Sequence, residues 1–196
     1  MRLKIPEIVL ASTSPRRQRL LAQVGIPFVV MPPDGAEEVP SGGDFGRVVV
    51  RNAETKALSV ISRAEGRIIL GADTIVELDG RALGKPANAD EARLMLNELS
   101  GRAHLVHSGV VLMDASRKAT YREHVVTRVL FRKLSGAEIE DYIESGEPFD
   151  KAGSYGIQER GALFIQQVEG CFFNVMGLPI ARLWEMLIRC LKERGD

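Results

Sequence analysis

Apolar runs and segments of helical periodicity alternate along the chain. The run over residues 8–11 ends at small hydroxyl residues, and a helical pattern over 15–24 follows at once. Later, a helical pattern over 45–64 precedes a continuous apolar run at 68–70, which is typical of a buried strand. Strands that alternate with helices in this way are typical of α/β and α+β domains.

The same pattern, read with turn and cap residues, predicts the remaining elements. Asp79-Gly80 is a hairpin signal, and Ser135 with Glu138 has the spacing of a capping box. We expect strands over residues 8–11, 28–31, 68–78, 103–113, 121–131 and 162–168. We expect helices over residues 15–24, 45–64, 90–99, 135–143 and 179–191, with Asp90 as a candidate N-cap of the third. The buried stripes of the second and last helices are predicted to include Val48, Val49, Ala53, Leu58, Ile61, Leu183, Trp184, Leu187 and Ile188.

Composition narrows the class of protein. The chain has 196 residues, 45% of them hydrophobic and 27% charged, which suits a single domain over residues 1–196. The formal net charge is zero, so no global field attracts nucleic acid or an anionic membrane. We expect no signal peptide, and no apolar run approaches the roughly 20 residues of a membrane span. Two cysteines make no disulfide framework, so we expect buried free thiols and a cytoplasmic protein.

A candidate phosphate site stands at the first strand-to-helix turn. Ser14 is a good N-cap and Pro15 a good first helical residue, and a helix N-terminus presents unpaired N–H groups. Arg16 and Arg17 add permanently charged, forked donors there. With Ser12, these residues form a candidate phosphate cradle. The alternative is an ordinary capped helix with solvated arginines.

Carboxylates gather in the loop after the second strand. Asp34, Glu37 and Glu38 are either solvated surface groups or ligands of a hard cation, because carboxylate oxygens suit magnesium and manganese. We expect the three histidines to be structural or surface groups, because no cysteine lies near them at zinc spacing.

Asp73 follows directly after the apolar run of the third strand. Partial burial there favours a general base or a metal ligand; the alternative is a turn aspartate that bonds its own backbone. Gly71 permits close approach to that position. Lys85 follows within one hairpin length and could return toward Asp73 to meet a phosphate. Lys56, within a helix, is by itself an ordinary exposed lysine.

A glycine-rich stretch over residues 150–158 is the last candidate. Gly153 and Gly156 let the backbone approach a ligand closely. Gln158 both donates and accepts, as reading a base edge requires. The alternative is a bulged hairpin that binds nothing.

Seven short motifs, most of them at these clusters, occur in a fixed order along the chain. They are LASTSPRR over residues 10–17, LGADTIV over 70–76, LGKP over 83–86, LSG over 99–101, GEP over 146–148, KAGSYGIQ over 151–158 and NVMGLP over 174–179. In this order they resemble the Maf family of nucleoside triphosphate pyrophosphatases over nearly the whole chain.

The resemblance implies an α/β fold similar to that of inosine triphosphate pyrophosphatases: a mixed twisted sheet with flanking helices and two lobes around a deep cleft. It implies a cytoplasmic hydrolase that converts a nucleoside triphosphate to its monophosphate and pyrophosphate. It also implies a divalent metal cation, namely magnesium, manganese or cobalt. Family members are often dimeric, so a homodimer is one expected assembly, with no nucleic-acid or membrane partner.

The resemblance also assigns roles to single residues. Asp73 resembles the proton acceptor for the attacking water, and Glu37 matches the acidic loop residue expected at the metal with Asp73. Arg17, Lys56 and Lys85 resemble the triphosphate contacts. The full expected substrate-binding set is Ser12, Ser14, Arg16, Arg17, Lys56, Thr74, Lys85 and Gln158.

Three of these residues match the positions that separate the family's branches. The branch that acts on 7-methyl-GTP has Trp, Gln and Glu where this chain has Arg16, Thr74 and Gln158. This chain therefore resembles the branch that acts on dTTP and UTP. A neutral glutamine amide also matches a pyrimidine imide edge.

The sequence departs from the family pattern at two positions. Ala36 stands where an aspartate is frequent, which leaves both Glu37 and Glu38 open as the metal ligand. Glu159 stands where a glycine is frequent, which changes the charge beside the expected base pocket.

The expected reaction is attack of a metal-activated water on the α-phosphorus, with pyrophosphate leaving. One rival is a pyrophosphatase for another nucleotide, either 7-methyl-GTP or a modified pyrimidine triphosphate. The other is a nucleotide-binding regulator of cell division and septum formation. Asp73 near Lys85 favours an enzyme, because a pure binder needs no carboxylate facing a triphosphate.

Overall fold

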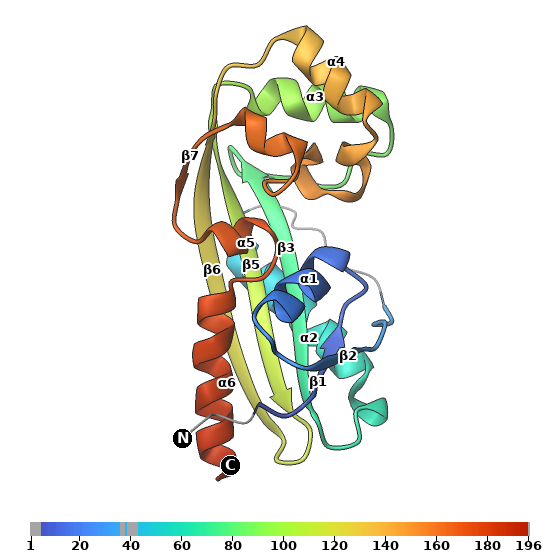
Figure 1. The fold of residues 1–196 in the computed structure, drawn as a ribbon, viewed down its shortest axis with the longest axis vertical. Coiled ribbons are helices and arrows are strands. Elements are labelled where there is room, and N and C mark those ends of the chain that lie inside the picture. Colours follow the sequence, from blue (N-terminus) through green and yellow to red (C-terminus); the bar gives the residue numbers. More distant parts are fainter. Residues whose placement is uncertain (1–4, 36–37, 39–42, 196) are drawn as a thin grey trace.

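A single mixed β-sheet runs the length of an elongated molecule (Figure 1). The computed structural model describes residues 5–35, 38 and 43–195. The strands are β1 (Ile8–Ala11), β2 (Phe28–Val30), β3 (Ile68–Leu78), β4 (Arg81–Leu83), β5 (Ala103–Asp114), β6 (Ala119–Phe131) and β7 (Ile165–Glu169). Their order is β2-β1-β3-β5-β6-β7, with β4 paired to β3. β1 is parallel to β2 and β3, and the other pairs are antiparallel. The expected mixed sheet with flanking helices is confirmed.

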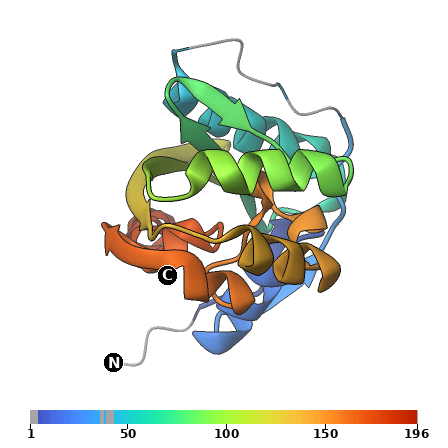
Figure 2. The ribbon, with the colours of Figure 1, turned by 90° about the horizontal axis from the view of Figure 1, so that it is seen from above.

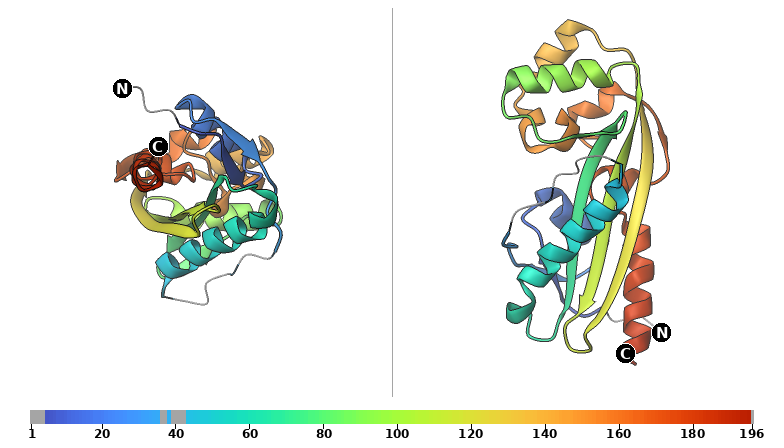
Figure 3. Two further views of the ribbon diagram at one scale, coloured as in Figure 1. Left: turned by 90° about the horizontal axis from the view of Figure 1, so that it is seen from below. Right: turned by 180° about the vertical axis from the view of Figure 1, so that it is seen from behind.

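Helices cover both faces of this sheet. They are α1 (Pro15–Gln23), α2 (Phe45–Ser59), α3 (Ala89–Leu99), α4 (Gly136–Glu144), α5 (Phe172–Val175) and α6 (Ile180–Arg194). Short 3-10 helices span Ile61–Arg63, Glu147–Asp150, Ala152–Ser154 and Arg160–Phe164. α3 and α4 cover one end of the molecule (Figure 2), and α2 and α6 lie on opposite sides of the sheet (Figure 3). In the described part of the chain, no helix has the length and hydropathy that crossing a bilayer requires.

One face of the sheet carries two separate apolar cores. Leu70 and its neighbours pack against α1 and α6, whereas Val76 and its neighbours pack against α3 and α4. Thr74 lies between them on the same face of β3, because alternate strand residues share a face. We call the two halves the α1–α6 lobe and the α3–α4 lobe. The cleft lies between the two lobes, where Thr74 interrupts the apolar face of β3.

On the opposite face, α2 lies unusually close to the sheet. A Cβ atom at Gly71 would stand 2.0 Å from the Ala53 carbonyl oxygen, and one at Gly109 would stand 2.3 Å from that of Val49. Only glycine fits these two strand positions. The close approach brings the polar side chains of α2 against β3.

One edge of β3 has an open stretch in its middle. Pairing with β1 ends at Gly71, and pairing with β4 begins at Val76. Over the described residues, the four positions between them have no strand partner on that side. Side chains from both faces of β3 can therefore meet in one cavity at this opening.

Several sequence-based expectations are wrong in detail. The N-cap of α3 is Asn88, whose side chain accepts from the Glu91 amide, and Asp90 lies in the first turn. The expected strand over 162–168 begins as a 3-10 helix and becomes β7 only at Ile165. The expected helix over 45–64 ends at Ser59. Three residues of the predicted buried stripes are exposed, because small residues occupy the close α2–sheet contact and the α6 stripe lies one position further round: Leu58, Ile61 and Trp184.

Candidate active site

Asp73 lies at the open edge of β3 and faces two side chains of α2. Its carboxylate accepts from Lys56 Nζ at 2.7 Å through Oδ1 and from Asn52 Nδ2 at 2.9 Å through Oδ2. Asn52 and Lys56 are four residues apart, so they lie on the same face of the helix. Asp73 is only 4% exposed. The carboxylate is therefore held in one orientation by donors on both of its oxygens.

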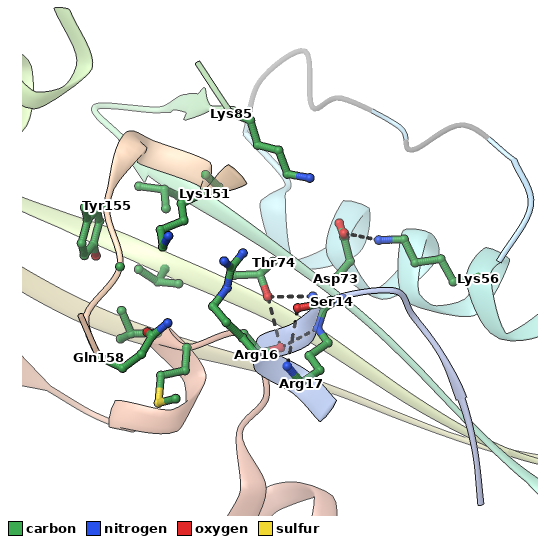
Figure 4. A pocket seen from close by; sticks show the side chains of 17 residues that line it. Ser14, Arg16, Arg17, Lys56, Asp73, Thr74, Lys85, Lys151, Tyr155 and Gln158 are labelled. Atoms are coloured by element: carbon green, nitrogen blue, oxygen red, sulfur yellow. Dashed lines mark hydrogen bonds and ion pairs between the residues drawn. The ribbon is translucent and has the colours of Figure 1, made fainter. Parts of the chain in front are cut away.

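Cavities surround this carboxylate. The main one is lined by residues from α1, α2, β3, the β4–α3 connection and the stretch over 151–158 (Figure 4): Ser14, Arg16, Arg17, Lys56, Asp73, Thr74, Lys85, Lys151, Tyr155 and Gln158. A second cavity contains Glu38 and Asn52 and shares Asp73, Thr74 and Lys85 with the first. Asp73 thus stands where the two cavities adjoin.

Arg17 connects the start of α1 to the middle of β3. Ser14 caps α1 by accepting from the Arg17 amide. The Arg17 guanidinium donates to the Gly177 carbonyl at 2.9 Å, and to the Ser12 and Thr74 hydroxyls at 3.2 Å each. Its side chain is nearly buried but still lines the cavity. The charge of Arg17 is consequently fixed beside Thr74.

Arg16 bridges the cleft to the α3–α4 lobe. Its guanidinium donates to the Asp150 carboxylate at 2.6 Å, and Asp150 also accepts from Lys151 at 2.8 Å. Burial alone would raise the pKa of Asp150, but the hydrogen bonds from Lys151 and Arg16 outweigh it and lower that pKa. Glu159 lies 3.1 Å from Lys151 and 3.6 Å from Arg19, so it adds to the same network.

The wall formed by the α3–α4 lobe contains buried polar atoms without partners. The Gln158 amide nitrogen is buried and has no acceptor within hydrogen-bonding distance among the described residues. The Tyr155 hydroxyl lies 2.7 Å from His104 Nε2, whereas His104 Nδ1 has no such partner there. Burial lowers the pKa of His104 to about 4 and raises that of Tyr155. Both side chains are therefore neutral near pH 7.

Comparison with known proteins decides the family. The sequence profile of the Maf family, described as Maf-like protein, matches residues 7–190. The chain belongs to the Maf family. Three relatives, each named dTTP/UTP pyrophosphatase, come from Pelotomaculum thermopropionicum, Carboxydothermus hydrogenoformans and Symbiobacterium thermophilum. They are 48%, 46% and 49% identical to this chain, over 92% of its length and over 95%, 97% and 92% of their own.

In this Maf protein, most of the predicted site residues line one cavity: Ser14, Arg16, Arg17, Lys56, Asp73, Thr74, Lys85 and Gln158. Ser12 does not line this cavity. Its hydroxyl accepts hydrogen bonds from the Arg17 guanidinium and from the Ser14 amide, so it supports two residues that do. Glu37 lies outside the described residues. The spacing of these residues in the sequence says little about this arrangement, which depends on where the elements pack.

Among the cavity residues that were not predicted as site residues, three carry polar side chains that bear on the site: Asn52, Lys151 and Tyr155. Asn52 is the contact of Asp73 described above, and its position one helical turn before Lys56 is a signal that could have identified it. Lys151 and Tyr155 line the main cavity from the predicted glycine-rich stretch. In the sequence, neither the lysine nor the tyrosine indicates a binding site, since both residue types also occur in loops that bind nothing.

The donor set near Asp73 fits magnesium better than zinc. The described residues contain no group of three or more His, Cys, Asp or Glu side chains that could hold a metal ion. Magnesium is usually held by one or two carboxylates together with substrate phosphates. Among the described carboxylates, Asp73 and Glu38 both line the second cavity, so they would supply such ligands.

Proposed function

We propose that this Maf protein hydrolyses dTTP and UTP to the nucleoside monophosphate and pyrophosphate. The observation that carries the proposal is a buried carboxylate, Asp73, in a cavity whose other charged lining side chains are all cationic. A carboxylate repels a triphosphate, so it weakens binding but suits proton transfer. The relatives named dTTP/UTP pyrophosphatase support the choice of nucleotide.

The cations approach the carboxylate from different elements. Arg16 and Arg17 come from the start of α1, Lys56 from α2, and Lys85 from the segment after β4 (Figure 4). A triphosphate in the cleft would lie among them. Positioned cations offset the charge on phosphoryl oxygens most strongly where water is excluded.

Asp73 is the proposed general base. It takes a proton from water as the water oxygen bonds to the α-phosphorus. The bond between the α-phosphorus and the bridging oxygen then breaks, and pyrophosphate leaves. Lys56 and Asn52 occupy one position on each carboxylate oxygen, and a carboxylate offers about four, so a lone pair stays available for the water proton. A divalent metal held by Asp73 and Glu37 or Glu38 would neutralise phosphate charge.

Gln158 is the proposed reader of the base. Its buried amide nitrogen lacks an acceptor in the described structure, and the carbonyl oxygens of a pyrimidine imide could supply one. A buried donor that finds a partner only in the complex favours the ligand that provides it. Arg16 and Thr74 line the same cavity and complete the proposed specificity set.

The test is pyrophosphate release by the purified chain from a panel of triphosphates, with magnesium, manganese and cobalt in turn. The panel contains dTTP, UTP, dCTP, GTP, 7-methyl-GTP, 5-methyl-UTP and pseudo-UTP. We expect dTTP and UTP to give the highest kcat/KM among the canonical nucleotides. Faster turnover of 7-methyl-GTP or of a modified pyrimidine would replace the proposed substrate. Nucleotide binding without any pyrophosphate release would instead indicate a regulatory binding protein.

A further inference from the structure

We infer that Asn52 is a positioning residue that joins the acidic loop at Glu38 to the proposed base, Asp73. The inference rests on the proposed function, because it concerns how that base is held. Asn52 is 4% exposed and lies on α2, at the open edge of β3. It lines the second cavity and not the main one, and we infer that its effect on turnover passes through Asp73 and Glu38.

The Asn52 amide makes three hydrogen bonds of equal length. Its Oδ1 accepts from the Glu38 backbone N–H at 2.9 Å. Its Nδ2 donates to the Glu38 backbone carbonyl and to Asp73 Oδ2, each at 2.9 Å. Both amide hydrogens and the amide oxygen are thereby used.

This pattern resembles strand pairing. Asn52 offers Glu38 an N–H and a C=O, as the peptide group of a neighbouring strand does. The open edge of β3 has no strand partner there in the described structure. The side chain of Asn52 consequently fixes the Glu38 backbone next to the Asp73 carboxylate.

Only an amide satisfies this arrangement. The two neighbours of Nδ2 are oxygen acceptors, whereas the neighbour of Oδ1 is an N–H donor. A flipped amide would place like atoms against one another at all three contacts. An aspartate at position 52 would keep the bond from the Glu38 N–H and lose both donations. A leucine of similar size would lose all three.

Comparing N52L with N52D distinguishes a role of Asn52 in positioning Asp73 from a role in the stability of the fold alone. We expect N52L to lower kcat for dTTP at least tenfold, with KM changed less than threefold, because the substrate contacts are intact. N52D should lower kcat at least as much, although it keeps the bond to the loop. The matched control is N97D, since Asn97 is exposed on α3 and lines neither cavity; it should have wild-type kcat. Each kcat is divided by the folded fraction from thermal melts.

Amide hydrogen exchange supplies a readout that needs no substrate. The Glu38 amide should exchange at least tenfold faster in N52L than in the wild type, and at a near wild-type rate in N52D. Unchanged Glu38 exchange in folded N52L, or unchanged kcat in both Asn52 variants, would overturn the inference. If the wild type releases no pyrophosphate from any nucleotide, the proposed function fails instead, and the exchange result still decides whether Asn52 holds the loop.

Discussion

The two walls of the cleft differ in how completely their polar atoms are bonded. On the α2 wall, both Asp73 oxygens accept hydrogen bonds, and Asn52 uses each of its donors and its acceptor. On the α3–α4 wall, the Gln158 amide nitrogen is buried without a partner among the described residues, and so is Nδ1 of His104, which lies on β5 and contacts the wall residue Tyr155. Each polar side-chain atom of Asp73 and Asn52 therefore has a hydrogen-bond partner, whereas the α3–α4 wall contains a buried donor that has none.

The difference separates two tasks that an enzyme of this kind has to perform. A carboxylate held by fixed donors needs no reorganisation when the reaction starts, which is the condition for effective proton transfer. A buried donor without an acceptor already carries the cost of desolvation, so a ligand that bonds to it gains affinity. We therefore assign the chemistry to the α2 wall and recognition of the base to the α3–α4 wall.

The largest expected effect tests the α2 wall. D73N keeps the shape of the side chain but removes the proton acceptor. We expect kcat for dTTP to fall by about 10²–10⁴-fold, as loss of a general base generally causes. Nucleotide affinity, measured by calorimetry, should stay the same or increase, because a negative charge leaves the cleft.

The matched control for D73N is D141N, since Asp141 is exposed on α4. It should turn over dTTP at the wild-type rate. Pyrophosphate release by D73N within threefold of the wild type would contradict the assignment of the base, and with it the division between the walls.

The structure brings most of the predicted site residues together, but their arrangement could not be predicted from the sequence. The resemblance to the Maf family identified Asp73, Lys56 and Gln158 as site residues, and all three line one cavity. The apolar run before Asp73 also predicted its burial. These are local properties of a motif or a strand, so a single sequence contains them.

What the sequence could not provide depends on how elements pack. Asp73 and Thr74 are consecutive and face opposite sides of β3, yet both line the cavity, because β1 and β4 stop short of them. The outward orientation of Leu58 depends on how closely α2 approaches Gly71 and Gly109. The role inferred for Asn52 depends on its contacts with Glu38 and Asp73, which its position one turn before Lys56 does not reveal.

The next effect concerns the stability of the α3–α4 wall. Burial lowers the pKa of His104 from 6.5 to about 4, so between these values the unfolded chain binds a proton that the folded chain excludes. The contribution of neutral, buried His104 to the free energy of unfolding is fully present above pH 6.5 and is lost as the pH drops toward 4. It amounts to about 3 kcal/mol over that range.

Urea unfolding between pH 7 and 4 measures this contribution. The free energy of unfolding of H104Q should lose about 3 kcal/mol less than that of the wild type. H124Q is the comparison: burial and the neighbouring His107 also lower the pKa of His124, but by less than burial lowers that of His104, so H124Q should deviate from the wild type in the same direction and less than H104Q does. The same pH dependence in H104Q and the wild type would show that a partner or water satisfies His104, and would weaken the contrast between the walls.

A smaller effect tests the recognition assigned to Gln158. In Q158E, a carboxylate that only accepts replaces the amide donor. We expect kcat/KM for dTTP and UTP to fall about 10–100-fold relative to the other nucleotides of the panel, the usual range for one lost buried hydrogen bond. Q166E, at an exposed glutamine of β7, should keep the wild-type ranking. An unchanged ranking in Q158E would remove Gln158 from base recognition.

The smallest expected effect concerns Asp150, which holds Arg16 across the cleft. The Asp150 side chain is 60% exposed, and exposed ion pairs contribute about 0.2–1 kcal/mol. D150N removes the negative charge that pairs with Arg16, so the guanidinium is held less tightly, although it keeps its bond to the backbone carbonyl of residue 150 at 3.2 Å. We expect KM for dTTP to fall up to about fivefold at low salt, less at high salt, with kcat unchanged. The control introduces D150N into R16Q, which has no guanidinium at position 16. There, D150N should lower KM by a smaller factor than it does in the wild type. An unchanged KM in D150N would mean that Arg16 contributes to the cleft through Asp150 alone, and that the α3–α4 wall is as fixed as the α2 wall.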